Sequence, residues 1–351
     1  MPLHFGKAVY AHQARYPLMT PQDYGKLAYQ TEFGPRHMAP EPEPETVLSC
    51  LLREWGAVPS WDAALPAEDL GEGVSRFHLT GAYDPEEAAP LLARLFLRTA
   101  QERRGSLDGL LEKLKLLREL EIPGMDGWLA EYRRQDFPAV HHSEAFRAAY
   151  HPHYRLLSAR YAHSFPALLA IGRLARAGKP AVVAIDGRCG SGKTWFAALI
   201  QELFPCNIVH MDDFYLPMEK RPPGWEDEVG GNMDFSRVLS ELLLPAKGGE
   251  PLCYRPYDCH SGRLAGAAEL PLHPLTIVEG SYSTHPHLGW QYDCTIFLTC
   301  SPKEQAGRLR ARDDSAFPMF QHRWIPMEER YFKLCGTQAQ CGHIIDTSDF
   351  S

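Results

Sequence analysis

The sequence predicts an α/β protein with a doubly wound parallel sheet, preceded by a mostly α-helical N-terminal domain. After about residue 160, short apolar stretches alternate with helical or loop segments, which is typical of a parallel sheet with helical crossovers. Before that point leucine-rich helical patterns dominate. A glycine-rich motif lies between an apolar stretch and a helical one. We therefore expect two domains, residues 1–160 and residues 161–351.

Residues typical of helix N-termini predict three helices in the N-terminal domain. Residues 20–23 resemble a capping box with proline at the first helical position, and the helix runs toward Phe33. Asp84 precedes a second helix, and Ser106 is expected to cap a third that ends before Pro123. The acidic, proline-containing residues 41–45 are expected to form an extended spacer.

The third helix carries a stripe of leucines at helical spacing. Its members are Leu107, Leu110, Leu111, Leu114 and Leu117. The stripe ends within two heptads, which favours a packed core over a coiled coil.

In the C-terminal domain a helix over residues 165–177 leads into the first strand, residues 181–185. Further strands are expected at residues 207–211, 275–278, 295–299 and 343–345. Ligands of such sheets bind beyond the carboxyl ends of the strands, so the residues that follow each strand are the first to inspect.

A phosphate-binding motif follows the first strand. The residues are Gly187, Arg188, Cys189, Gly190, Ser191, Gly192, Lys193 and Thr194, a GxxxxGKT pattern that we call the phosphate loop. Its glycines let backbone N–H groups turn inward around phosphates, Lys193 supplies a charge, and the Thr194 hydroxyl can ligate Mg²⁺. The apolar stretch after it is expected to be the helix whose N-terminus faces the anion. A surface loop with the same letters is the alternative, and the flanking strand and helix argue against it.

Acidic residues follow the second and third strands. Asp212 and Asp213 follow the second, and Glu279 follows the third, so all three are expected to face the crevice beside the phosphate loop. Asp212 suits a base for an acceptor hydroxyl, and Glu279 suits Mg²⁺ ligation. The alternatives are a helix cap or exposed turn for the aspartates and a structural hydrogen-bonding role for Glu279.

Arginines follow the fourth strand in a helical segment. Arg308 and Arg312 share a helix face and could close over a triphosphate as a lid. The alternative is a solvated basic face paired with Asp313 and Asp314.

Over roughly residues 165–351 these motifs resemble the uridine kinase group of P-loop kinases, related to phosphoribulokinase and pantothenate kinase. The resemblance rests on the phosphate loop, residues 212–215, the segment from Asn232 to Asp258, and residues 278–280. It implies an ATP- and Mg²⁺-dependent phosphotransferase in which Asp212 is the base and Glu279 belongs to the Mg²⁺ shell. Arg308 and Arg312 correspond loosely to the lid arginines of the family.

The resemblance also implies acceptor contacts. Asp234 maps to the residue that binds ribose hydroxyls, and Tyr257 with His260 maps to the nucleobase contacts; Asp213 and Tyr215 belong to the same region. The chain departs from the family at Asp213, where serine is usual, in the insertion 216–231, in the Tyr-to-His spacing and in residues 324–329. These departures bear on the nucleobase contacts more than on the phosphoryl chemistry.

The overall composition limits the classes of partner that the protein is expected to bind. The formal net charge of −8 argues against a general nucleic-acid binder, and no apolar stretch approaches the ~20 residues of a membrane span. Nine scattered cysteines suit reduced thiols, so we expect a cytoplasmic protein. A homo-oligomer is compatible with the sequence. Histidine pairs near residues 141–153 could converge on a metal ion, and the alternative is ordinary hydrogen-bonded or surface histidines. The Cys/His groups near residues 253–260 and 335–343 lack the close Cys-x₂-Cys spacing of zinc sites.

Three functional hypotheses follow. The leading one is a small-molecule kinase that transfers the γ-phosphoryl group of ATP to a hydroxyl acceptor, with a uridine- or cytidine-like nucleoside as the first acceptor to test. The second keeps the chemistry but takes a sugar, a pantothenate-like alcohol or a glycerate-like acid. The third is a nucleotide-sensing or interaction protein without transferase activity, against which the paired Asp212 and Glu279 argue. No chemistry emerges for the N-terminal domain; capping the kinase, oligomerisation and partner binding are its candidate roles.

Overall fold

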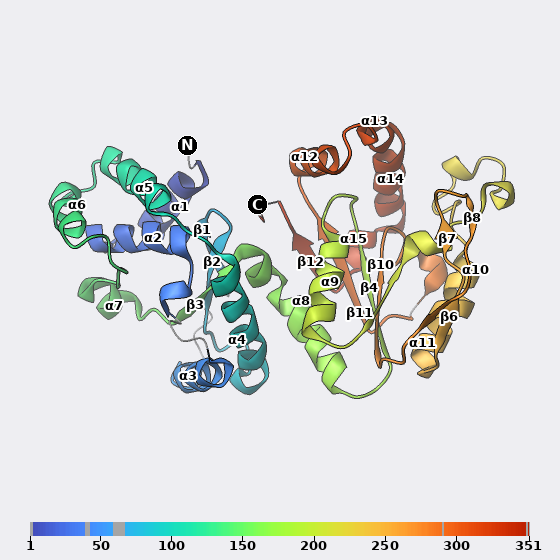
Figure 1. The fold of residues 1–351 in the computed structure, drawn as a ribbon, viewed down its shortest axis with the longest axis horizontal. Helices are drawn as coiled ribbons and strands as arrows, with labels where there is room; N and C mark the ends of the chain where they lie inside the picture. Colours follow the sequence, from blue (N-terminus) through green and yellow to red (C-terminus); the bar gives the residue numbers. More distant parts are fainter. Residues whose placement is uncertain (1–2, 39–42, 59–66, 290, 349, 351) are drawn as a thin grey trace. The chain divides into compact units, whose positions relative to one another are not determined.

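The computed structural model of the chain describes residues 3–38, 43–58, 67–289, 291–348 and 350. Residue contacts divide the chain into an N-terminal unit that ends at His163 and a C-terminal unit, Ser164–Ser348. Each has its own hydrophobic core. The α/β fold class predicted from the sequence is confirmed (Figure 1).

The N-terminal unit is mostly helical and contains a small antiparallel sheet in the order β1-β2-β3. Its elements are α1 (Leu3–Arg15), α2 (Pro21–Phe33), α3 (Pro44–Gly56), β1 (Ala67–Gly71), β2 (Val74–His78), α4 (Pro85–Glu102), α5 (Leu107–Glu119), α6 (Met125–Arg134), α7 (Glu144–Tyr150) and β3 (Tyr154–Ser158). Helix α8 (Ala159–Arg176) begins in this unit. Side chains of α1, α2, α5 and the sheet, such as Phe5, Leu27, Leu114 and Leu156, form the core.

The predicted helix starts of this unit are confirmed. Asp23 accepts hydrogen bonds from the backbone N–H and hydroxyl of Thr20, Asp84 caps α4, and the Ser106 hydroxyl accepts from the N–H of Gly109. These polar side chains satisfy N–H groups that have no partner within the helix.

The structure adds one sheet that was not predicted and corrects three expectations about local structure. The sheet was not predicted, because β2 buries a charged residue, Arg76, and so lacks a regular apolar–polar alternation. Within the expected spacer, Pro44 begins α3, as proline suits the first helical turn, and residues 41–42 lie outside the described residues. Leu107 and Leu111 are exposed, because α5 packs along a single face. Helix α8 starts at Ala159, before the predicted residue 165.

The C-terminal unit is built around a parallel sheet in the order β12-β11-β4-β10-β5 (Figure 1). Its strands are β4 (Ala181–Gly187), β5 (Asn207–His210), β10 (Leu275–Glu279), β11 (Cys294–Thr299) and β12 (His343–Asp346), and every pairing is parallel. All residues of β4 and β10 are buried, as expected of central strands covered on both faces. The five strands match those predicted from the apolar stretches.

Helices and short hairpins surround this sheet. The helices are α9 (Lys193–Leu203), α10 (Phe235–Arg237), α11 (Leu244–Gly248), α12 (Pro302–Arg312), α13 (Phe317–Met319), α14 (Ile325–Cys335) and α15 (Thr337–Gln340), and the hairpin strands are β6 (Leu252–Tyr254), β7 (Tyr257–Asp258), β8 (Arg263–Leu264) and β9 (Ala268–Leu270). Helix α9 packs on β4, β5 and β10. The carboxyl ends of these three strands therefore lie at one edge, next to the phosphate loop.

Candidate active site

The phosphate loop connects β4 to α9, as predicted. Gly187 has φ +134°, and a Cβ atom there would lie 2.0 Å from the carbonyl oxygen of Leu298 on β11. Gly190 and Gly192 also have positive φ. Helix α9 begins at Lys193, so its N-terminal N–H groups and the positive end of its dipole belong to the loop. Backbone sterics therefore produce an anion-binding turn at this strand end.

The functional side chains of the loop contact backbone oxygens and the end of β10. The Lys193 ammonium donates to the carbonyl oxygens of Gly187 and Arg188, at 2.7 and 3.1 Å. The Thr194 hydroxyl donates to Glu279 Oε1 at 3.0 Å. The predicted convergence of the loop with the end of the third strand is thus present in the structure.

Glu279 also contacts His210, which the sequence analysis missed. The two residues are register partners on adjacent strands, and His210 Nδ1 lies 2.6 Å from Glu279 Oε1. The hydrogen bond to Glu279 raises the pKa of His210. Burial alone would raise the pKa of Glu279, but the His210 hydrogen bond and the Lys193 charge bring it below its ordinary value. Glu279 is therefore an ionised, nearly buried carboxylate beside the loop.

Asp212 and Asp213 follow β5 in a short 3₁₀ turn, Met211–Phe214, and have different surroundings. Asp212 is exposed and interacts with the Tyr215 hydroxyl, whose pKa is raised by burial and by this carboxylate. Asp213 accepts a hydrogen bond from the Tyr254 hydroxyl at 3.0 Å, and burial raises its pKa. Asp212 is thus the accessible carboxylate of the pair, while Asp213 is tied to β6.

The residues predicted to contact the acceptor are brought together in part. The Asp234 backbone N–H donates to the Phe214 carbonyl, while its side chain caps α10 through the N–H of Arg237. The rings of Tyr215 and Tyr257 meet edge to face at 6.1 Å. His260 is exposed in the turn between β7 and β8, where its N–H donates to Asp258.

The two predicted lid arginines have different contacts. Arg308 on α12 reaches the phosphate loop, donating to the Gly190 carbonyl at 3.3 Å and to Thr347 at 2.8 Å. Arg312 instead lies over the ring of Phe320. The structure thus brings Arg308 to the loop and directs Arg312 to an aromatic ring on the following segment.

Two acidic residues of α14 brace the loop. Glu328 is buried; it accepts from the Cys189 N–H at 2.9 Å and from the Ser281 hydroxyl at 2.5 Å. Glu329 binds the Arg188 guanidinium through both of its oxygens, at 2.6 and 3.0 Å. Burial and the Glu328 charge raise the pKa of the Cys189 thiol, which disfavours the reactive thiolate. The loop is therefore fixed by a helix more than 130 residues further along the chain.

A buried carboxylate, Asp186, supports the loop from behind. It is fully buried and accepts from the Gly187 N–H, from the N–H and hydroxyl of Thr284, and from the Tyr331 hydroxyl, at 2.7–3.0 Å. Burial raises its pKa, and these four donors compensate for the loss of water. The rule that ligand-site residues follow strand ends could have indicated Asp186, which follows the predicted strand 181–185, but not His210, which lies within the predicted strand 207–211. Glu328 and Glu329 lie in a segment for which the sequence suggested no role.

The residues at the strand ends fit a bound Mg²⁺. The Thr194 hydroxyl and the Glu279 carboxylate are hard oxygen donors in mutual contact, and Mg²⁺ in nucleotide sites takes few protein ligands beside phosphate oxygens and water. Among the residues that the structure describes, no group of three or more His, Cys, Asp or Glu side chains could hold a metal ion. A metal here would therefore depend on the phosphates of a nucleotide for its remaining ligands.

Comparison with known proteins gives matches at the level of fold. No protein-family model matches the sequence. The chain is similar to the structure of a possible uridine kinase from Bacillus stearothermophilus, with 18% identity, a TM-score of 0.40, and coverage of 50% of this chain and 97% of that one. It is also similar to a protein from Silicibacter sp. TM1040 proposed to be a fructose transport system kinase, with 22% identity, a TM-score of 0.41, and coverage of 51% and 97%. These matches cover about half of this chain.

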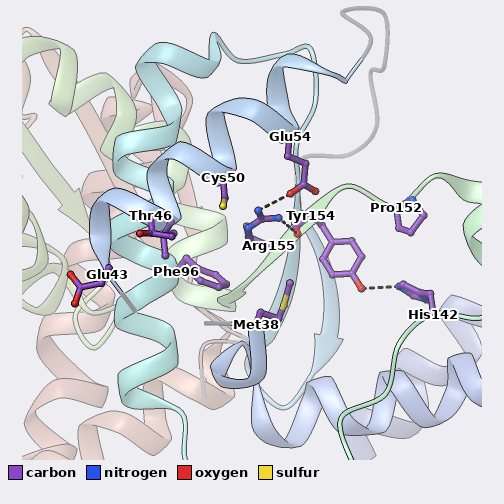
Figure 2. A pocket seen from close by; sticks show the side chains of 11 residues that line it. Met38, Glu43, Thr46, Cys50, Glu54, Phe96, His142, Pro152, Tyr154 and Arg155 are labelled. Atoms are coloured by element: carbon purple, nitrogen blue, oxygen red, sulfur yellow. Dashed lines mark hydrogen bonds and ion pairs between the residues drawn. The ribbon is translucent and has the colours of Figure 1, made fainter. Parts of the chain in front are cut away.

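The N-terminal unit contains a separate cavity of about 620 Å³, shown in Figure 2. Arg155 on its wall pairs with Glu54 at 2.7 Å, and the Tyr154 hydroxyl lies 2.7 Å from His142 Nε2. Behind this wall, His142 Nδ1 contacts the fully buried Asp23 at 3.1 Å.

In the described part of the chain, each helix is either too short or too polar to cross a lipid bilayer.

Proposed function

We propose that the chain is an ATP- and Mg²⁺-dependent phosphotransferase that phosphorylates a hydroxyl group of a small molecule. The observation that carries the proposal is the convergence of three groups at one edge of the sheet. The phosphate loop follows β4, Glu279 ends β10 in contact with Thr194, and the accessible Asp212 follows β5. A donor site, a metal site and a base are the parts that phosphoryl transfer requires.

In this proposal the loop N–H groups and the N-terminus of α9 bind the β- and γ-phosphates of ATP, and Lys193 moves from the loop carbonyls to the phosphates. Thr194 and Glu279 hold Mg²⁺, which neutralises phosphate charge. Arg308 stabilises charge from the α12 side, because it already reaches the Gly190 carbonyl. Asp212 orients the acceptor hydroxyl and accepts its proton as the new P–O bond forms and the bond to the ADP oxygen breaks.

A nucleoside is the acceptor class that we favour. Tyr215 and Tyr257 place aromatic surface beside Asp212, which suits a flat base. Asp234, whose backbone N–H donates to the Phe214 carbonyl beside Tyr215, would bind sugar hydroxyls. An acidic acceptor would need a nearby cation. Arg221 instead donates to the Leu216 carbonyl and stacks on Trp225, and Arg237 binds Glu241.

A substrate panel tests this proposal. The protein is incubated with Mg²⁺ and ATP in the presence of nucleosides, sugars, pantothenate-like alcohols and glycerate-like acids, and phosphorylated acceptors are identified by mass. Phosphorylation of a nucleoside would support the proposal in full. Phosphorylation of another alcohol would retain the chemistry and change the acceptor. Slow ATP hydrolysis without any phosphorylated acceptor would favour a nucleotide sensor.

A further inference from the structure

A second, smaller cavity of the N-terminal unit has a cationic and phenolic lining. Its volume is about 180 Å³. Two arginines, Arg15 and Arg76, line it together with several histidines and tyrosines. No aspartate or glutamate is among the described residues that line it. The lining therefore has the charge of an anion site.

The central cation of this cavity is held rigidly. Arg76 on β2 is 2% exposed, and its Nε and Nη2 atoms donate to Gln30 Oε1 at 3.2 and 2.9 Å. Its guanidinium also stacks over the Tyr154 ring at 4.9 Å. A fixed, desolvated guanidinium binds an oxyanion without a large loss of side-chain entropy.

The charges around the cavity do not balance internally. Glu68, behind the lining, is the acidic partner of both arginines; it lies 3.5 Å from Arg76 and 3.7 Å from Arg15. Two guanidinium groups thus share one carboxylate, which leaves a positive charge in excess even when the nearby imidazoles are neutral. The same carboxylate is 3.4 and 3.5 Å from the Nε2 atoms of His12 and His78, so two imidazoles and two guanidinium groups surround it.

Further donors approach from other elements. Tyr150 on α7 accepts the Leu18 N–H through its hydroxyl oxygen, which leaves the hydroxyl proton available to donate. The Tyr16 ring lies against the Tyr150 ring, with centroids 4.9 Å apart, while its hydroxyl is hydrogen-bonded to Glu68. His151 also lines the cavity and adopts a left-handed conformation, φ +42° and ψ +59°, which is uncommon for a residue other than glycine.

We propose that this cavity binds a phosphate group, either as the free ion or on a small phosphomonoester. The polar groups that line the cavity come from α1, β2, α7 and the segment before β3, and a tetrahedral dianion, unlike a planar carboxylate, has oxygens directed toward several walls. The inference is independent of the proposed phosphotransferase activity, because it concerns residues of the other unit.

Binding is tested by calorimetric titration with inorganic phosphate, glycerol 3-phosphate and glycerol. Hydrogen exchange locates the site, because the phosphate loop is itself expected to bind phosphate. We expect the two phosphate compounds, but not glycerol, to protect residues 144–158 in addition to any protection of residues 187–196. Tighter binding of glycerol 3-phosphate indicates a phosphomonoester ligand, and tighter binding of inorganic phosphate indicates the free ion.

Variants then connect the binding to the cavity. Arg15 is 38% exposed, so Arg15→Gln should fold normally, and it should weaken binding at this site roughly tenfold or more. His151→Asn, which tolerates the left-handed backbone, should weaken it less. Arg118→Gln, on the exposed side of α5, is the matched control and should bind as the unmodified protein does. Protection confined to residues 187–196, or equal affinity in Arg15→Gln, would overturn the proposal.

Discussion

Gly187 is the position at which backbone geometry most directly determines the phosphate loop. Its φ of +134° is accessible to glycine alone without strain, and β11 approaches so closely that no side chain fits. The sequence motif predicted a glycine here from the need to expose N–H groups. The structure adds a second reason, the contact with the Leu298 carbonyl.

We predict that Gly187→Ala destabilises the C-terminal unit by more than about 3 kcal/mol, because the new Cβ must displace a central strand. Chemical denaturation monitored by tryptophan fluorescence measures the change. Gly178→Ala is the control: it also has a positive φ but meets no atom within 4 Å, so it should cost only about 1–2 kcal/mol. Equal losses in the two variants would show that the strand contact is unimportant.

Asp212 is the residue on which the proposed chemistry depends. We predict that Asp212→Asn lowers turnover with the phosphorylated acceptor at least about 100-fold, because the amide cannot accept the hydroxyl proton, while ATP affinity stays close to that of the unmodified protein. Steady-state kinetics and nucleotide titration measure the two quantities. Asp227→Asn, an exposed acid on the 216–231 insertion, should leave both unchanged. Normal turnover in Asp212→Asn would remove Asp212 from the mechanism.

At the scale of elements, α14 acts as a brace for the phosphate loop. Arg188 binds Glu329 through two oxygens and Thr299 at 2.6 Å, and its guanidinium lies over the rings of Phe297 and Phe332, at 5.8 and 5.6 Å from their centroids. The loop thus depends on β11 and α14 together. Glycine placement makes the turn possible, and these contacts hold it in one conformation.

We predict that Arg188→Lys lowers the stability of the C-terminal unit by about 1–3 kcal/mol and raises the KM for ATP several-fold. An ammonium group cannot replace the planar fork of the guanidinium or its stacking. Urea unfolding and steady-state kinetics measure these effects. Arg330→Lys, an exposed position on the same helix, should change neither quantity. Unchanged stability in Arg188→Lys would mean that α14 does not support the loop.

At the scale of the whole molecule, each unit has buried polar groups that are sensitive to pH. In the N-terminal unit, burial lowers the pKa of His142 to about 4, although the neighbouring Asp23 partly opposes this shift. Burial alone would raise the pKa of Asp23, but hydrogen bonds from His142, Ser143 and Thr20 hold it below its ordinary value. The folded unit therefore contains a neutral imidazole beside an ionised carboxylate.

This arrangement predicts a loss of stability in acid. An unfolded histidine titrates near ~6.5, so the contribution of neutral His142 is complete above that pH and is lost progressively as the pH falls toward about 4. Its maximum size is about 3 kcal/mol. We expect His142→Gln to be less stable at pH 7.5 and to lose less stability than the unmodified protein between pH 7.5 and 5, by urea unfolding. His141→Gln, its exposed neighbour, is the control, and an identical pH dependence in both variants would contradict the prediction.

Short-range patterns account for what could be predicted. The phosphate loop, the five parallel strands and three helix caps are encoded by adjacent residues, so the five strands of the C-terminal sheet and the position of the loop followed from sequence alone. The strand-end rule also placed Glu279 and Asp212 at one edge, where the structure has them. Backbone sterics and apolar periodicity act over a few residues, and the sequence therefore determines them by itself.

Tertiary structure decided the contacts between distant segments. The pairing of His210 with Glu279 depends on strand register, the brace from Glu328 and Glu329 depends on where α14 packs, and Arg312 turns to Phe320 because an aromatic ring lies within its reach. In the N-terminal unit, Arg76 lies on a strand that sequence periodicity could not identify, because its side chain is buried against Glu68 and Gln30 and is not exposed to water. These contacts join residues that are far apart in the sequence, and the packing free energy of the folded chain determines which of them form. A local sequence pattern therefore does not predict them.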